Sequence, residues 1–175
     1  NNSIAIQEGY TLDKSNISFF HKGKRRKPKS FFELPGKTWF WTGHGILAND
    51  KLIIFLFEEK SIEADPGFEA IGWYIAIIDN PFENPLNWKI RYVKGPDTFG
   101  VIVGSSAVLK DKDFIYAYGV TEPSSHEVYL LRLPINKIGE DDIAEIEWWN
   151  EGNWTTRREK LPAPSPLFIG QTEFS

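Results

Sequence analysis

The chain has 175 residues, of which 41% are hydrophobic and 15% aromatic, and its formal net charge is −4. This composition is typical of a globular domain with a sizeable core and excludes a disordered chain. The absence of cysteine excludes disulfides and thiolate chemistry, and no apolar run reaches the roughly 18–20 residues of a membrane-spanning helix. The acidic balance argues against a nucleic-acid binder, so we expect neither a membrane nor a nucleic-acid partner.

Short strands bounded by Gly, Pro, Asn and Asp are predicted along the whole chain. Residues 3–7 and 17–21 are read as the last two strands of a unit whose first two strands are missing. Strands at 38–47 and 101–109 open two complete units, and 166–175 open another. The single predicted domain at 1–175 therefore divides into four parts: 1–37, 38–100, 101–160 and 161–175.

A unit of about 60 residues occurs twice, which is a period typical of β-repeat proteins. Four apolar or aromatic runs recur in the same order in 43–90 and in 104–149. Four antiparallel strands per unit is the β-propeller blade. The predicted fold is thus an all-β propeller, with two complete and two partial blades covering about half of the ring. A half ring exposes strand edges and an apolar face, so we expect a piece of a larger propeller that self-associates in isolation.

Several motifs carry a family resemblance: the aromatic run 39–41 before Gly43-His44-Gly45, the stretch 104–119, the run 129–134, and the tryptophan cluster 148–154. Together they resemble the five-bladed β-propeller proteins related to glycoside hydrolases, many of them bacterial and exported. The resemblance implies that carbohydrate binds in the central funnel, that catalytic carboxylates lie on innermost strands, and that the protein is secreted or periplasmic. The sequence departs from the pattern because the opening strand of the first blade, where such proteins usually place an acidic residue, is absent here.

Glycoside hydrolysis needs two carboxyl groups that flank one bond. Glu173 is the carboxylate that the propeller geometry places on an inner strand, so it is the candidate general acid. The alternative interpretation is that Glu173 is a polar residue near the end of a fragment. Asp97 is the candidate catalytic partner, although Pro-Asp-Thr is also a common start of a turn. The histidines are not at ligand spacing, so neither a metal site nor a cofactor is predicted.

Four further residues are candidate substrate-binding groups because the first strand of each blade lines the channel. His44 is read either as a partner of a sugar hydroxyl or as a hydrogen-bond link between blades. Trp41 is read as a stacking platform for a sugar ring or as a packing residue. Ser105 and Gln171 complete the set, although small residues such as Ser105 also let inner strands approach closely.

Residues 22–29 hold six Lys and Arg side chains and no acid. The run is read either as a site for an anionic polymer or, more simply, as a solvated loop. The loops 58–70, with Asp65, and 122–127, with His126, are expected on one face of the propeller. The expected function is a glycan-acting propeller, and the residues leave open whether it is a glycoside hydrolase with its site in the central channel or a non-catalytic glycan- or protein-binding propeller.

Overall fold

The computed structural model describes residues 2–9, 16–24, 26–122, 125–138, 142–143, 145–156 and 164–170. In this part of the chain the fold is all-β, as predicted, with antiparallel strand pairs and short 3-10 turns such as η2 (Pro85–Asn87) and η3 (Ile135–Lys137). No helix in the described segments is long and apolar enough to cross a membrane.

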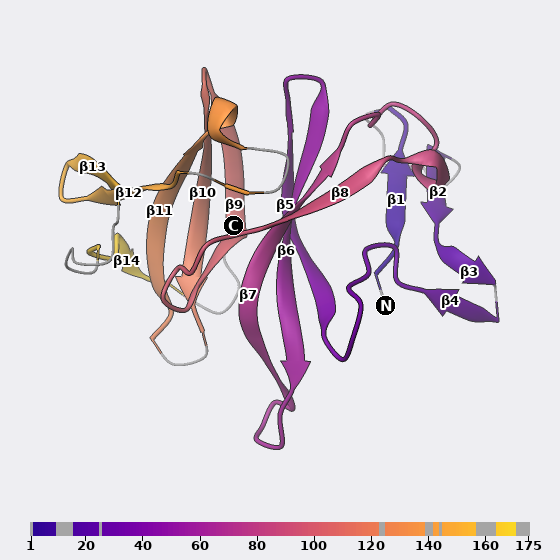
Figure 1. The fold of residues 1–175 in the computed structure, drawn as a ribbon, viewed down its shortest axis with the longest axis horizontal. Coiled ribbons are helices and arrows are strands. Elements are labelled where there is room, and N and C mark those ends of the chain that lie inside the picture. The colour runs from indigo at the N-terminus through magenta and orange to yellow at the C-terminus, as the bar shows by residue number, and fades with distance from the viewer. Residues whose placement is uncertain are drawn as a thin grey trace.

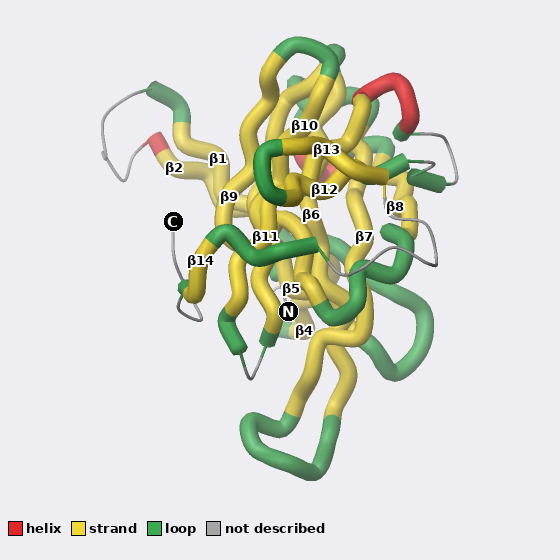
Figure 2. The backbone as a smooth tube through the Cα atoms, turned by 90° about the vertical axis from the view of Figure 1, so that its left-hand side faces the viewer, coloured by secondary structure: helices red, strands yellow, loops and turns green. Residues whose placement is uncertain are grey.

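The first large sheet is a four-stranded antiparallel meander at the centre of the molecule (Figure 1). Its strands follow chain order: β5 (Trp39–Ala48), β6 (Lys51–Ser61), β7 (Phe68–Ile78) and β8 (Ile90–Lys94). Asn49 and Asp50 have φ of 50° and 61°. Positive φ at both central residues is the geometry of a tight two-residue hairpin, which is why β5 turns directly into β6. The β6–β7 hairpin projects beyond the rest of the sheet in both views (Figures 1 and 2).

The second large sheet repeats this order. It runs β9 (Val101–Asp111), β10 (Phe114–Thr121), β11 (Glu127–Pro134) and β12 (Glu147–Asn150), and β13 (Asn153–Thr156) extends it. The short β14 (Phe168–Ile169) pairs with β11 in the same sheet. The two meanders match the two complete units of the sequence repeat. The boundaries of the predicted blades, and the start of a further blade at 161–175, stay predictions.

Two small antiparallel pairs precede the large sheets: β1 (Ile4–Gln7) with β2 (Ile17–Phe20), and β3 (Lys22–Lys24) with β4 (Lys27–Lys29). The described part of the basic run therefore forms a pair of strands in which Lys24, Lys27 and Lys29 are exposed and Lys22 is half-buried, whereas the simpler sequence interpretation was a solvated loop. Asn2 attaches this region to the first sheet, since its Nδ2 donates to the backbone oxygens of Phe32 and Phe40, each at 3.2 Å.

The core has two parts because β6 is buried on both faces. Alternate residues Ile53, Phe55 and Phe57 face the second large sheet and belong to a core cluster that also contains Trp73 and Trp148. The intervening Leu52, Ile54 and Leu56 face the N-terminal segment and a second cluster around Phe31 and Phe32. Each fully buried side chain of this kind contributes about 1.5–3 kcal/mol. Trp73 and Trp148 are 2% and 3% exposed, so both rings belong to this core.

The inner strands β5 and β9 approach each other most closely at two glycines. A Cβ on Gly43 would lie 2.6 Å from the carbonyl oxygen of Gly104, and a Cβ on Gly104 would lie 2.4 Å from Cγ of Phe55. Gly104 also has φ of 78°, which disfavours any other residue. The glycine that opens each repeat thus allows the two sheets to meet.

Both inner strands are also irregular at the same position of the repeat. The register of β5 with β6 shifts between Thr42 and Gly45, and the register of β9 with β10 shifts next to Gly119. Extra residues in one strand of a pair redirect side chains and are common next to functional sites. His44 lies within the first irregularity and Ser105 within the second.

A cation–aromatic cluster joins the outer strands of the second sheet. Nε of Arg132 lies 2.6 Å from Oε2 of Glu147. The guanidinium also lies 4.1 Å from the ring centroid of Phe114 and 4.2 Å from that of Trp154. The planar group is thus held between two rings and a carboxylate, a role that a lysine ammonium fills poorly.

Candidate functional site

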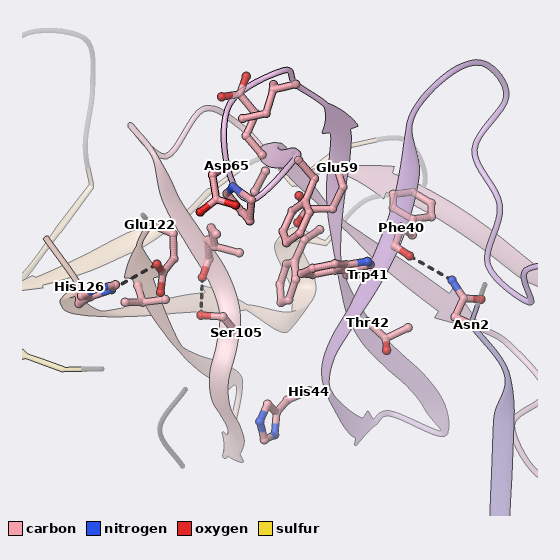
Figure 3. Close-up of a pocket in the computed structure, with 18 of the residues that line it drawn as sticks. Asn2, Phe40, Trp41, Thr42, His44, Glu59, Asp65, Ser105, Glu122 and His126 are labelled. Carbon is pink, nitrogen blue, oxygen red and sulfur yellow. Dashed lines mark hydrogen bonds and ion pairs between the residues drawn. The ribbon is translucent and has the colours of Figure 1, made fainter. Parts of the chain in front are cut away.

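A cleft of about 1470 Å³ lies between β5, the β6–β7 hairpin and the second sheet (Figure 3). Apolar groups from all three sides line it, together with Asn2 and Ser3 from the N-terminal segment. Its titratable lining residues are His44, Glu59, Asp65, Glu69, Glu122 and His126. The cleft therefore combines aromatic surface with several carboxyl groups, a composition typical of ligand sites.

Glu59 is the most perturbed acid of the cleft. It continues the alternation of Ile53, Phe55 and Phe57 on β6, so its side chain faces the second sheet and is 3% exposed. Burial raises the pKa of this carboxyl from 4.5 to about 7. Its Oε2 has no hydrogen-bond partner among the described residues. Because a desolvated carboxylate is disfavoured, Glu59 holds a proton near neutral pH and is able to donate it.

The neighbouring Glu58 has a different environment. It lies on the other face of β6, and its Oε2 is 3.9 Å from Nζ of Lys94. The register of β6 with β7 shifts between Glu58 and Glu59, so that Glu59 pairs with Ala70 and Glu58 with Gly72. The side chains of Glu58 and Glu59 thus lie on opposite faces of β6. Of the two, only Glu59 lines the cleft.

Glu122 and His126 lie on the opposite wall, at the connection between β10 and β11 (Figure 3). Nδ1 of His126 is 3.2 Å from Oε2 of Glu122, an ion-pair distance, although the two groups are not aligned as a hydrogen bond. Within the described part of the chain, Oε1 of Glu122 is buried without a partner. The imidazole therefore lies close to one carboxylate oxygen and does not contact the other.

Two more acids come from the β6–β7 hairpin. Oε1 of Glu69 is 2.7 Å from Nζ of Lys60, and both side chains are about half exposed. Asp65, at the tip of the hairpin, is exposed and forms no ion pair with any described residue. Asp65 is therefore an exposed cleft carboxylate without a cationic partner among the described residues.

Trp41 supplies an open aromatic surface on β5. Its side chain is 45% exposed, and its ring centroid lies 4.4 Å from that of Phe68 on β7. Large exposed aromatic rings of this kind offer an apolar face to a flat ligand. Trp41 lines the cleft, and its predicted role as a sugar platform stays a prediction.

The other predicted site residues are distributed as follows. His44 and Ser105 both line the cleft, and Oγ of Ser105 donates to the carbonyl oxygen of Ile102 at 2.9 Å. Asp97 does not line the cleft; its Oδ1 accepts a hydrogen bond from the Phe99 backbone N–H at 2.8 Å, which is the turn-start role that the sequence offered as the alternative. Gln171 and Glu173 lie outside the described residues.

Sequence reasoning missed Glu59, because 58–70 was read as a face loop. In the structure β6 extends to Ser61, and the loop begins after it. The signal was present: Glu59 follows Ile53, Phe55 and Phe57 with a spacing of two, which predicts the same face for all four. An acid at a position that otherwise holds core residues is unusual, and it indicates a candidate functional residue.

No three His, Asp or Glu side chains of the described segments come together in a way that would hold a metal ion. The carboxyl and imidazole groups that line the cleft are able to transfer protons and to form hydrogen bonds.

Comparison with known proteins identifies a solved structure with a similar fold and a protein family. None of the curated proteins compared matches the chain. The fold is similar to a crystal structure from Bacteroides ovatus that is described as a "putative hydrolase", with a TM-score of 0.62 and 13% identity over 88% of this chain and 43% of that one. The chain thus spans less than half of that protein, and the likeness shows a shared fold. A family model matches residues 1–164, and the chain therefore belongs to the family described as Domain of unknown function (DUF5005).

Proposed function

We propose that this chain is part of a glycan-acting β-propeller and that its cleft binds carbohydrate for hydrolysis of a glycosidic bond. The observation that carries the proposal is Glu59, a carboxyl with 3% exposure and a pKa of about 7 that lines the same cleft as the open ring of Trp41. A carboxyl group that is still protonated near neutral pH is what a general acid requires. The hydrolase description of the fold relative and the family resemblance support the same reading.

In this proposal Glu59 donates its proton to the leaving glycosidic oxygen. Asp65 is the second carboxyl, because it is exposed and unpaired among described residues, whereas Glu69 and Glu122 lie next to Lys60 and His126. Asp65 either accepts a proton from the attacking water or attacks the sugar itself, and the anomer of the product distinguishes the two. Trp41 stacks on a sugar ring and orients the bond.

The test is a hydrolysis screen over a broad glycoside panel, with the longest native polypeptide that contains this segment. We expect cleavage of at least one glycoside and a kcat/KM that falls as pH rises through about 7, where Glu59 loses its proton. Glu59→Gln should lower kcat by roughly 10²–10⁴-fold, the usual contribution of a general acid. Glu58→Gln is the matched control, since Glu58 lies on the opposite face and should leave kcat within about twofold.

A second candidate function is a propeller that binds glycans without turnover. It is favoured by the fact that two of the four cleft carboxylates have a cationic or imidazole neighbour, which leaves few groups for chemistry. This reading expects a glycan that binds to the wild type and to Glu59→Gln with equal affinity and is cleaved by neither. Cleavage that disappears in Glu59→Gln while binding persists would exclude it.

A further inference from the structure

The cleft contains more acid than glycoside hydrolysis needs. Four carboxyl residues line it, Glu59, Asp65, Glu69 and Glu122, and no Lys or Arg of the described residues does. Hydrolysis uses two carboxyl groups, and the proposed function assigns Glu59 and Asp65 to them. Glu69 is neutralised by Lys60 at 2.7 Å. Glu122 is therefore the remaining carboxylate, and it has no assigned role.

The surroundings of Glu122 indicate a missing cationic partner. Its side chain is 19% exposed, and Oε1 is buried without a partner in the described segments. Nδ1 of His126 lies 3.2 Å from the other oxygen, without the alignment of a hydrogen bond. Glu59 faces the same cleft with an unpartnered Oε2 at 3% exposure. Buried carboxylate oxygens are normally compensated by donors, and a ligand cation is able to supply them.

We propose that the glycan in this cleft carries free amino groups, and that Glu122 binds one of them as an ammonium. The inference rests on the proposed function and names its substrate class. An ammonium gains from the acidic lining, whereas the carboxylates or sulfates of an anionic glycan would meet like charges without a Lys or Arg in the described lining to offset them. An N-acetylated sugar has the same shape but lacks the charge, so it is the natural comparison.

The experiment measures calorimetric affinities at about pH 6, where a sugar amine is charged. The ligands are glucosamine, N-acetylglucosamine and galacturonic acid oligosaccharides of equal length. We expect the glucosamine oligosaccharide to bind roughly tenfold more tightly than the acetylated one, and the uronate to bind most weakly. Glu122→Gln should weaken binding of the amine by roughly two- to fivefold and leave binding of the acetylated oligosaccharide unchanged. Glu63→Gln, an exposed acid of the same hairpin that does not line the cleft, is the control and should match the wild type.

The outcomes separate the two proposals. Equal binding of the amine and acetylated oligosaccharides, tighter binding of the uronate, or equal weakening of both by Glu122→Gln would overturn the amino-sugar inference and leave a glycan-binding cleft. Binding of none of the three would overturn this inference, and failure of the whole glycoside panel would overturn the proposed function as well. If Glu122→Gln does not fold, the salt dependence of wild-type binding decides: amine affinity should fall as salt rises, and an affinity independent of salt would refute the inference.

Discussion

The burial of Glu59 makes a prediction about stability that does not depend on any substrate. The folded-state pKa of about 7 lies above the ordinary value of 4.5. Below pH 4.5 the carboxyl is protonated in both the folded and the unfolded chain, and its contribution to stability is fully present. As pH rises toward 7, the unfolded chain ionises freely while the folded chain does not, so the free energy of unfolding falls.

The size of the effect follows from the shift. A pKa of about 7 against 4.5 corresponds to a loss of about 3 kcal/mol once both states are ionised. Between about pH 5 and about pH 8 the linkage relation gives a loss of about 2.5 kcal/mol. Glu59→Gln keeps the shape of the side chain and removes the ionisation, so the loss should be absent from this variant. Exposure of 3% means that solvent screening reduces the effect little.

The assay is urea unfolding followed by tryptophan fluorescence at several pH values from about 5 to about 8. The quantity compared is the change in the free energy of unfolding across this range, since the amide alters the absolute stability as well. Glu58→Gln is the control and should parallel the wild type because it leaves Glu59 intact. Parallel profiles for the wild type and Glu59→Gln would refute the reasoning, since they would mean that Glu59 ionises as easily in the folded chain as in the unfolded one.

Further substitutions test the close approach of the sheets, the aromatic platform and the cation–aromatic cluster. Gly104→Ala should lower the free energy of unfolding by about 3 kcal/mol or more, because the added Cβ would lie 2.4 Å from Cγ of Phe55 at a φ of 78°. Gly100 has a φ of 84° but open space around it, so Gly100→Ala should lower the free energy of unfolding by only about 1 kcal/mol in the same thermal denaturation series. Trp41→Ala should weaken glycan binding by roughly tenfold through loss of stacking and leave the thermal midpoint almost unchanged, and unaltered affinity would remove Trp41 from the site. Arg132→Lys should destabilise by about 1–2 kcal/mol in urea unfolding, since an ammonium does not stack between the two rings; a change below about 0.5 kcal/mol would mean that the cluster contributes no more than an ordinary surface pair.

The fold class could be read from the chain because the information is local. Alternating apolar residues and turn residues act over a few positions, and they predicted strands at 3–7, 38–47 and 101–109, which the structure has at Ile4–Gln7, Trp39–Ala48 and Val101–Asp111. The repeated glycine was also visible, and the structure adds the reason, which is the contact between Gly43 and Gly104. The closure of a ring and the number of blades stay predictions.

The candidate site could be predicted only in part. Trp41, His44 and Ser105 were found because they follow from their place on the inner strands, and they do line one cleft. Glu59 was missed because the acids after Phe57 resemble the start of a loop, whereas the strand continues to Ser61. Asp97 starts a turn in the structure, and its catalytic role stays a prediction.

The sequence by itself determined the all-β class, the place of the inner strands and the alternation of residues along them. Tertiary structure decided which of these residues meet. Glu59 and Glu122 come from different sheets, and they share a cleft because β5 and β9 pack at their glycines. The raised pKa of Glu59 has the same origin, since desolvation is produced by neighbours distant in the chain and no local pattern encodes it.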